Sequence, residues 1–244
     1  MVFPIHTTVK NTLLEVRMNE LNLLAQVILC FGGLLLVKKF FKKEGIFAWI
    51  TLATCLAEIQ TSKTVSIFGW DCCMGTVLFA STFLATDMLR ESYGEEESKK
   101  GPFFALMGAL IYIIFALLTP LGKPVDYCIE VQNAMQVLFS VSLRITVASV
   151  IMLFIANMVD VKLYNYLYKK TDGKKMWLRN NVCTIISNGL ENYLFVFLGF
   201  YGTFMGGLGY DMKTVLIVAT VTTVIEILVA LLDTPFLYLS KKIN

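Results

Sequence analysis

Long apolar runs restrict this sequence more than any other feature. A chain needs about 20 apolar residues to cross ~30 Å of hydrocarbon, and runs of that length recur from Leu21 to Tyr238. Hydrophobic residues make up 57% of the 244 residues and the mean hydropathy is +0.69, whereas a soluble domain would interrupt its apolar runs with a polar face. Backbone amides in lipid must bond within their own segment, and the period-2 alternation of membrane strands is absent. The sequence therefore predicts an all-α, polytopic integral membrane helical bundle.

We expect seven spans, six forming the core and one added as an N-terminal helix. The predicted domains are a leader at 1–20, an extra transmembrane helix with a basic cytosolic loop at 21–44, and a six-helix core at 45–244. The fifth span is longer than a bilayer needs, so it should tilt or extend into the cytosol. The predicted spans are approximately Leu21–Val37, Gly45–Ser66, Cys72–Leu89, Pro102–Leu118, Ala134–Tyr166, Trp177–Tyr201 and Thr214–Tyr238.

The distribution of basic residues predicts the orientation. Thirteen follow the first, third, fifth and seventh spans and four lie at the opposite ends, and basic loops stay in the cytosol. The N-terminus is therefore expected outside and the C-terminus inside the cytoplasmic (inner) membrane. No cleavable signal peptide is predicted, and Met1 and Met18 both stay open as the natural start. The thirteen are Lys38, Lys39, Lys42, Lys43, Arg90, Lys99, Lys100, Lys169, Lys170, Lys174, Lys175, Lys241 and Lys242.

Motifs of membrane enzymes are missing from the sequence. Its one histidine is His6, which argues against a Ser–His dyad, an HExxH zinc site or a bis-His haem protein. No GxxxxGK[ST] loop is present, so the chain does not hydrolyse ATP itself. The six cysteines form no CxxC pair and are interpreted as small buried hydrophobes. We predict no enzyme, cofactor, metal site or direct nucleic-acid partner, and only a carboxylate-based mechanism stays open to an enzyme.

Ionisable and amide side chains inside the spans are the candidate functional residues, because they are costly in a membrane and mark a site or a pathway. Helical rise sorts them into a cytosolic layer and a mid-membrane layer. So many polar groups imply a polar interior, which suits a carrier of a polar solute better than a scaffold. The predicted gating or structural group is Asp87, Arg144, Asp160, Arg179 and Asp233, in which Arg144 lies above the mid-membrane layer. The predicted substrate-binding group, at mid-membrane, is Glu58, Gln60, Asn188, Glu191, Asn192 and Glu226.

Simpler interpretations of these residues stay open. Asp87 and Asp160 lie near helix ends and could be solvated at the interface. Arg179, with Asp87 as its expected partner, could lock helices together without touching a substrate. Asp87, Asp160 and Asp233 are spaced by 73 residues each, which suggests three similar two-helix units, although helix pairs of this length give such spacings without a repeat.

Four blocks of the sequence carry a family resemblance. FLATDMLRESYG, RITVASVIMLFIANMVDVKLYNYL, WLRNNVCTIISNGLEN and LLDTPFLY resemble the signature blocks of the queuosine precursor transporter family, also described as vitamin uptake transporters. The resemblance covers roughly residues 45–240. It implies a bacterial inner-membrane importer of 7-deazaguanines, the bases used to make queuosine in tRNA. By position, Asp87, Arg144, Asp160, Trp177 and Asp233 match the family pattern.

Other positions depart from that pattern. Asn157 and Asn188 stand where the resemblance implies Gln, Glu191 where Asp is usual, Glu58 where an amide is commoner, and Glu226 where Lys is common. These changes make the mid-membrane layer more acidic. A carboxylate can accept the N–H donors of a 7-deazaguanine, and an extra acid favours a cationic amine. The expected substrate is therefore an amine-bearing base, 7-aminomethyl-7-deazaguanine or queuine.

The mode of transport and assembly has alternatives. The chain could be a stand-alone facilitative carrier, a proton-coupled one, or a substrate-binding subunit that recruits an external ATPase. Ala53 and Ala57 form a small-xxx-small pair in the second span that could dock such a module, although the same pattern serves ordinary helix packing. A membrane scaffold or receptor is the non-transport alternative. The sequence leaves open a homodimer and a proton as the coupling ion.

Overall fold

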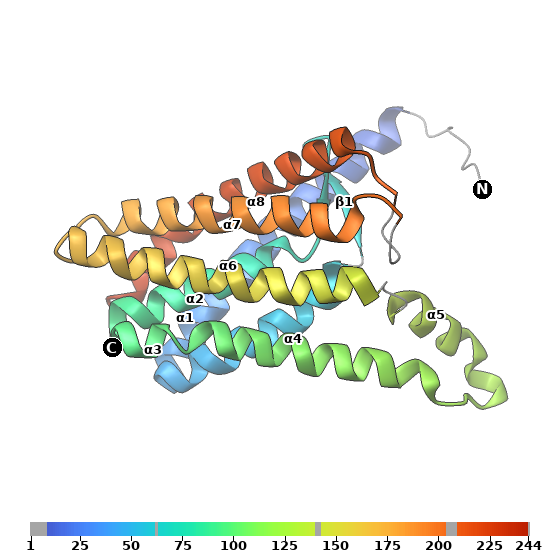
Figure 1. Ribbon diagram of the computed structural model, residues 1–244, viewed down its shortest axis with the longest axis horizontal. Coiled ribbons are helices and arrows are strands. Elements are labelled where there is room, and N and C mark those ends of the chain that lie inside the picture. Colours follow the sequence, from blue (N-terminus) through green and yellow to red (C-terminus); the bar gives the residue numbers. More distant parts are fainter. Residues whose placement is uncertain (1–8, 62, 140–142, 204–208, 244) are drawn as a thin grey trace.

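A computed structural model describes residues 9–61, 63–139, 143–203 and 209–243, without the side chains at 9–17, 64, 71–73 and 143–146. The long helices lie side by side along the long axis of the molecule (Figure 1). The helices are α1 (Val9–Thr61), α2 (Thr76–Tyr93), α3 (Glu95–Ser98), α4 (Gly101–Leu118), α5 (Ile129–Phe139), α6 (Leu143–Lys170), α7 (Met176–Phe200) and α8 (Met212–Ser240), with 3-10 turns at Thr119–Leu121 and Asp126–Cys128.

The predicted all-α membrane class is confirmed. Within the described ranges, five segments are long and apolar enough to cross a membrane. The first of them covers 44 residues and includes both arms of α1. Those segments are Met18–Thr61, Glu95–Leu121, Val147–Lys170, Met176–Phe200 and Met212–Ser240.

The first two predicted spans are two arms of α1. The helix turns at Lys42, whose φ of 52° and ψ of −137° are not helical. Gly45 makes this turn possible, because a Cβ at that position would lie 2.7 Å from Val37 Cγ1. Phe31 of the first arm (9–41) and Ile50 of the second arm (43–61) are fully buried in one hydrophobic cluster. The two arms therefore pack on the same core.

A β-hairpin corrects the expected ends of the second and third spans. Strands β1 (Thr64–Ile67) and β2 (Trp70–Cys73) pair antiparallel, so the second span ends at Thr61 and the third begins at Thr76. Phe68 and Gly69 both have positive φ, 52° and 79°, as a two-residue type I′ hairpin turn requires. Asn19 Nδ2 donates to Ser66 O at 3.0 Å and ties the hairpin to the first arm of α1.

The fifth predicted span, Ala134–Tyr166, is also corrected. Two helices replace it: α5 ends at Phe139 and α6 runs from Leu143 to Lys170. In Figure 1, α5 extends away from the bundle at the end opposite the C-terminus. Helix α6 continues four residues beyond Tyr166, the predicted end of the span, and an extension into the cytosol stays a prediction.

Helix α2 is the most enclosed long helix. Nearly every residue from Thr76 to Leu89 is buried, because α2 packs on both arms of α1 and on α8, α6 and α4. A helix enclosed by other helices has no lipid-facing stripe, so it can carry polar side chains such as Thr86 and Asp87. This position explains why α2 is absent from the apolar segments above.

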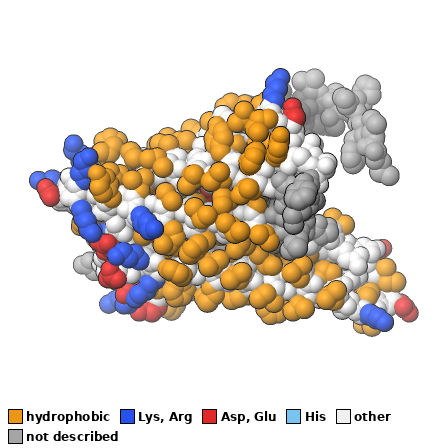
Figure 2. Space-filling model, viewed as in Figure 1, with side chains coloured by type: hydrophobic (Ala, Val, Ile, Leu, Met, Phe, Trp, Pro, Cys, Tyr) orange, Lys and Arg blue, Asp and Glu red, His pale blue; other side chains and the backbone are white. Residues whose placement is uncertain are grey.

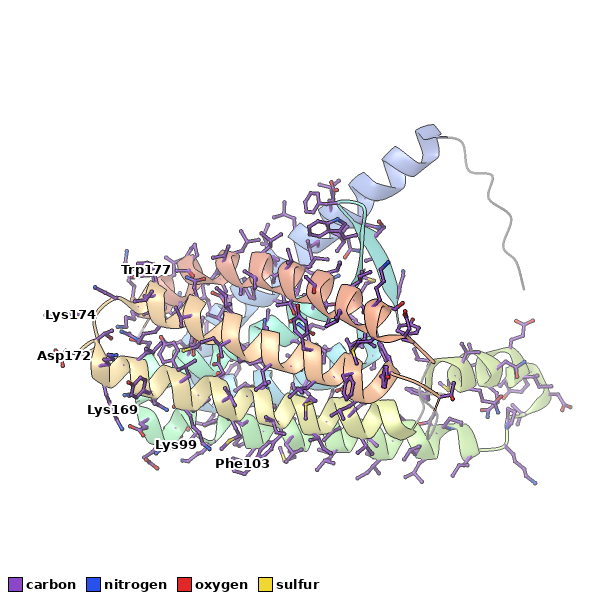
Figure 3. The ribbon with its side chains drawn as sticks, turned by 45° about the horizontal axis from the view of Figure 1, so that its top comes forward. Lys99, Phe103, Lys169, Asp172, Lys174 and Trp177 are labelled. Carbon is purple, nitrogen blue, oxygen red and sulfur yellow. The ribbon has the colours of Figure 1, made fainter. Side chains whose placement is uncertain are left out.

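The four basic loops meet at one end of the bundle, which we call the basic end. Lys43 Nζ lies 3.4 Å from Glu97 Oε1, and Lys169 Nζ lies 2.7 Å from Glu95 Oε2. Figure 2 shows most of the charged side chains of this face at the left end and hydrophobic ones over the middle. Figure 3 places Lys169 and Lys174 at the same end. The cytosolic location of this end stays a prediction.

Candidate functional site

The inward face of α7 is unusually polar. Its buried residues recur every three or four positions, so they form one face of the helix. This face packs against α6 and α8, and apolar side chains are few along it until Val196. The buried polar members are Arg179, Asn180, Thr184, Ser187, Asn188 and Asn192, with Cys183 among them.

Three acids from three other helices lie beside the half of this face that is nearer the basic end. Asp87 on α2, Asp160 on α6 and Asp233 on α8 are 2%, 0% and 1% exposed. Ser187 Oγ donates to Asp160 Oδ1 at 2.9 Å, and Asn180 Nδ2 donates to Asp233 Oδ1 at 2.6 Å. Asp87 lies close enough to Asp160 and Asp233 to interact with their charges. The structure thus brings together the acids that the sequence places in the cytosolic layer.

Glu91 closes the basic end below these acids. Its side chain is fully buried and pairs with the fully buried guanidinium of Arg179. Tyr164 Oη donates to Glu91 Oε1 at 2.9 Å, and Lys241 Nζ lies 2.6 Å from Glu91 Oε2. Helices α2, α6, α7 and the residue after α8 therefore meet at one carboxylate. This corrects the expected pairing of Arg179 with Asp87.

Several buried hydrogen-bond acceptors in and around this group of acids have no donor. Asp87 Oδ2, Asp160 Oδ2, Asn157 Oδ1 and Asn188 Oδ1 are buried without a hydrogen-bond partner among the described residues. Asn157 lies one turn from Asp160 on α6, so both share one helix face. Buried polar atoms are nearly always hydrogen-bonded, and an orphaned group calls for a functional reason. This cluster is suited to a ligand rich in N–H donors.

The mid-membrane residues form a second group nearer the opposite end. Asn192 Nδ2 donates to Glu226 Oε2 at 2.6 Å, joining α7 to α8. Ser149 Oγ donates to Glu58 Oε1 at 3.2 Å, joining α6 to the second arm of α1. Glu191 lies close enough to both Glu226 and Glu58 to interact with their charges. These three acids come from α1, α7 and α8.

Other predicted residues lie apart from these groups. The Oε1 atom of Gln60 is buried without a partner, but no described contact links it to Glu191. The side chain of Arg144 lies outside the described part of the chain. Trp177 is 52% exposed at the basic end (Figure 3). Ala53 and Ala57 are buried inside the bundle, so they serve helix packing and do not present a surface to an external module.

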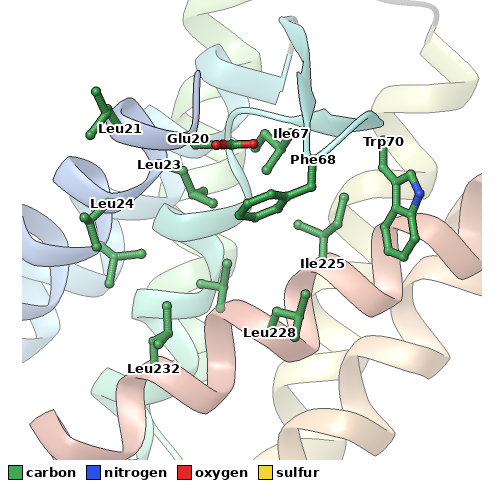
Figure 4. A pocket seen from close by; sticks show the side chains of 12 residues that line it. Glu20, Leu21, Leu23, Leu24, Ile67, Phe68, Trp70, Ile225, Leu228 and Leu232 are labelled. Carbon is green, nitrogen blue, oxygen red and sulfur yellow. The ribbon is translucent and has the colours of Figure 1, made fainter. Parts of the chain in front are cut away.

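The pocket in Figure 4 is separate from this site. It lies between the first arm of α1, the hairpin and α8, and its lining is apolar apart from Glu20. Phe68 and Trp70 reach it from the hairpin, and Ile225 and Leu228 from α8. None of the predicted site residues lines it. Among the described residues, no group of three or more His, Cys, Asp or Glu side chains could hold a metal ion.

Sequence reasoning missed Glu91 and Ser187. Glu91 lies four residues after Asp87 on the same face of α2. This spacing could have identified it, but its position near the predicted cytosolic end of the span suggests a solvated residue. Ser187 is uncharged, and only its three-residue spacing from Thr184 marks it as part of the polar face. Buried polar residues from four helices thus lie together inside the bundle, with the Arg179–Glu91 ion pair at one end.

Two comparisons with known proteins match this chain. The family model described as "Putative vitamin uptake transporter" matches residues 73–240. A protein of Bacillus subtilis (strain 168), described as "Probable queuosine precursor transporter", is 30% identical over 218 residues, which cover 88% of this chain and 91% of that protein. No solved structure matches the chain.

Proposed function

Because the chain belongs to the vitamin uptake transporter family, we propose that it imports queuosine precursors across the cytoplasmic membrane. A transporter of this family is a membrane carrier and not an enzyme. The relative from Bacillus subtilis carries the same substrate class in its description. Its identity of 30% extends over nearly all of both chains, which supports transfer of the class to this protein.

The observation that carries the proposal is the set of orphaned acceptors between α2, α6 and α7. A 7-deazaguanine presents N–H donors at N1 and at its 2-amino group. Asp160 Oδ2, Asn157 Oδ1 and Asn188 Oδ1 are buried acceptors that lack donors. A bound base would satisfy them, and a carboxylate that accepts two N–H groups is a strong recognition element. We therefore propose that the base contacts Asp160 Oδ2, Asn157 Oδ1 and Asn188 Oδ1.

The mid-membrane acids extend this site toward the opposite end. Glu191 interacts with the charges of both Glu58 and Glu226, and no described basic side chain forms an ion pair with any of the three. An ammonium group on the base would relieve their mutual repulsion. The proposed substrate is therefore an amine-bearing precursor, 7-aminomethyl-7-deazaguanine or queuine, in preference to a neutral nitrile.

Uptake by the purified protein in proteoliposomes tests the function. Labelled 7-aminomethyl-7-deazaguanine should enter vesicles that contain this chain alone. Asn188→Ala and Asp160→Asn should each reduce substrate affinity by roughly 10- to 100-fold, the effect of losing a hydrogen bond to a charged or buried group. Glu96→Gln, at a side chain that is 84% exposed, is the matched control and should transport normally.

Two results would contradict parts of the proposal. Transport that requires an added ATPase subunit would favour the alternative of a substrate-binding subunit. Equal uptake of 7-cyano-7-deazaguanine, unchanged by Glu226→Gln, would remove the amine preference and leave the substrate class intact. Failure of every 7-deazaguanine to enter, in vesicles whose protein is folded, would overturn the function itself.

A further inference from the structure

A second apolar groove runs along the outer face of the first arm of α1. It has a volume of about 770 Å³, and Ile28, Leu29, Gly32 and Leu36 line it. Leu29 is 71% exposed and Leu36 is 57% exposed. No described part of the chain covers these side chains, so the groove opens toward the surroundings of the bundle.

The length of the groove along α1 is close to the thickness of the hydrocarbon layer in one membrane leaflet. It extends along α1 from Ile28 to Lys39, a distance of about 16 Å at 1.5 Å per residue. The hydrocarbon core of a bilayer is ~30 Å thick, so half of it is about 15 Å. A single acyl chain that lies along the helix axis would therefore stay in contact with the groove over its length.

Two lysines stand at the basic end of the groove. Lys39 comes from α1 and Lys242 follows α8, and both line the groove. Neither forms an ion pair with a described acid. The neighbouring Lys38 keeps the two chain segments that carry these lysines side by side. Its Nζ donates to Ser240 O at 2.5 Å and to Ser92 Oγ at 2.6 Å. The groove is thus apolar along its length and doubly positive at one end.

We propose that this groove binds an anionic phospholipid. An acyl chain lies over Gly32, and the head-group phosphate lies between Lys39 and Lys242. Basic pockets beside membrane helices recognise anionic head groups in this way, and lysine stems extend along apolar surface while the ammonium meets the phosphate. The pocket of Figure 4 is apolar too, but it carries Glu20 and no lysine, so it lacks the charge that selects a phosphate.

Gly32 offers a way to block the acyl chain without disturbing the fold. A Cβ at Gly32 would meet no atom within 4 Å, whereas a Cβ at Gly33 would lie 3.1 Å from the ring of Trp49. The space beyond Gly32 is therefore the groove itself. Gly32→Leu fills that space from a helical position that tolerates leucine well.

The test compares lipid binding by delipidated full-length protein, measured by native mass spectrometry. Wild type should bind phosphatidylglycerol more tightly than phosphatidylcholine. Lys39→Gln with Lys242→Gln should weaken phosphatidylglycerol binding about 30-fold, the ratio expected from two lysines near a phosphate. Gly32→Leu should weaken binding of both lipids. Lys174→Gln with Lys175→Gln removes the same charge at the same end but outside the groove, and it should bind like wild type.

Several outcomes would overturn the proposal. One is equal binding of the two lipids by wild type, and another is a loss in the Lys174/Lys175 control as large as in the Lys39/Lys242 variant. Inorganic phosphate that competes as well as the lipid would identify a phosphate site instead. A change from dimer to monomer in Gly32→Leu would assign the groove to a second copy of the chain. Unfolding temperatures close to wild type establish that each variant is folded.

Discussion

Arg179 is the largest fully buried side chain among those described, and Glu91 balances its charge inside the bundle. Removing one partner of a buried ion pair leaves the other charge uncompensated, which costs about 3–5 kcal/mol. We expect Glu91→Ala to lower the free energy of unfolding by that amount. The measurement is reversible unfolding in detergent, followed by circular dichroism.

Lys241→Ala is the matched control at the same carboxylate. Its side chain is 42% exposed, and ion pairs that reach solvent contribute about 0–1 kcal/mol. Lys241→Ala should therefore change the free energy of unfolding only slightly. If both substitutions cost the same, Arg179 is not the partner that makes Glu91 essential.

At the scale of the helices, α4 depends on a stripe of small residues. Gly101, Ala105 and Gly108 are buried and face the rest of the bundle. A Cβ at Gly108 would lie 2.6 Å from the backbone oxygen of Thr51, so α4 and the second arm of α1 touch backbone to backbone. We expect Gly108→Ala to force them apart and to lower the free energy of unfolding by about 1–3 kcal/mol.

Gly189 on α7 gives the comparison for this substitution. A Cβ there would meet nothing within 4 Å. Gly189→Ala should be neutral or stabilise the protein by up to about 1 kcal/mol, since alanine is the better helix former. Thermal unfolding of the two variants separates close packing from helix propensity, and equal losses in both would refute the close-packing account of α4.

For the whole molecule, the prediction concerns which end faces the cytosol. Basic loops stay on the cytosolic side, and the four basic loops meet at one end of the bundle (Figure 2). In a background without the six native cysteines, Lys174→Cys should react with a membrane-impermeant thiol reagent only from the cytosol. Lys123→Cys, in the loop after α4, should react only from outside. The reverse pattern in intact cells would invert the topology.

Hydropathy and charge predict most of this architecture, because a segment in a bilayer must be apolar and satisfy its backbone hydrogen bonds internally, and basic loops gather on one side. The polar residues of α7 and the acids of α2, α6 and α8 are visible in the sequence as costly groups in apolar runs. The hairpin is not, since Thr64–Cys73 is apolar enough to extend two helices and only the Phe68–Gly69 turn separates them. Glu91 is not predicted either, because depth along one helix says nothing about which neighbours cover its end.

The basic end has a consequence for how the protein is made. Ser240 accepts a hydrogen bond from Lys38, 202 positions earlier in the chain, and Lys241 pairs with Glu91. Synthesis proceeds from the N-terminus, so the arms of α1 and α2 enter the membrane long before these partners exist. Lys38 and Glu91 gain their full set of contacts only after Ser240 and Lys241 have left the ribosome. A nascent chain that has not yet reached Ser240 and Lys241 therefore lacks the contacts that join the first arm of α1 and α2 to the end of α8.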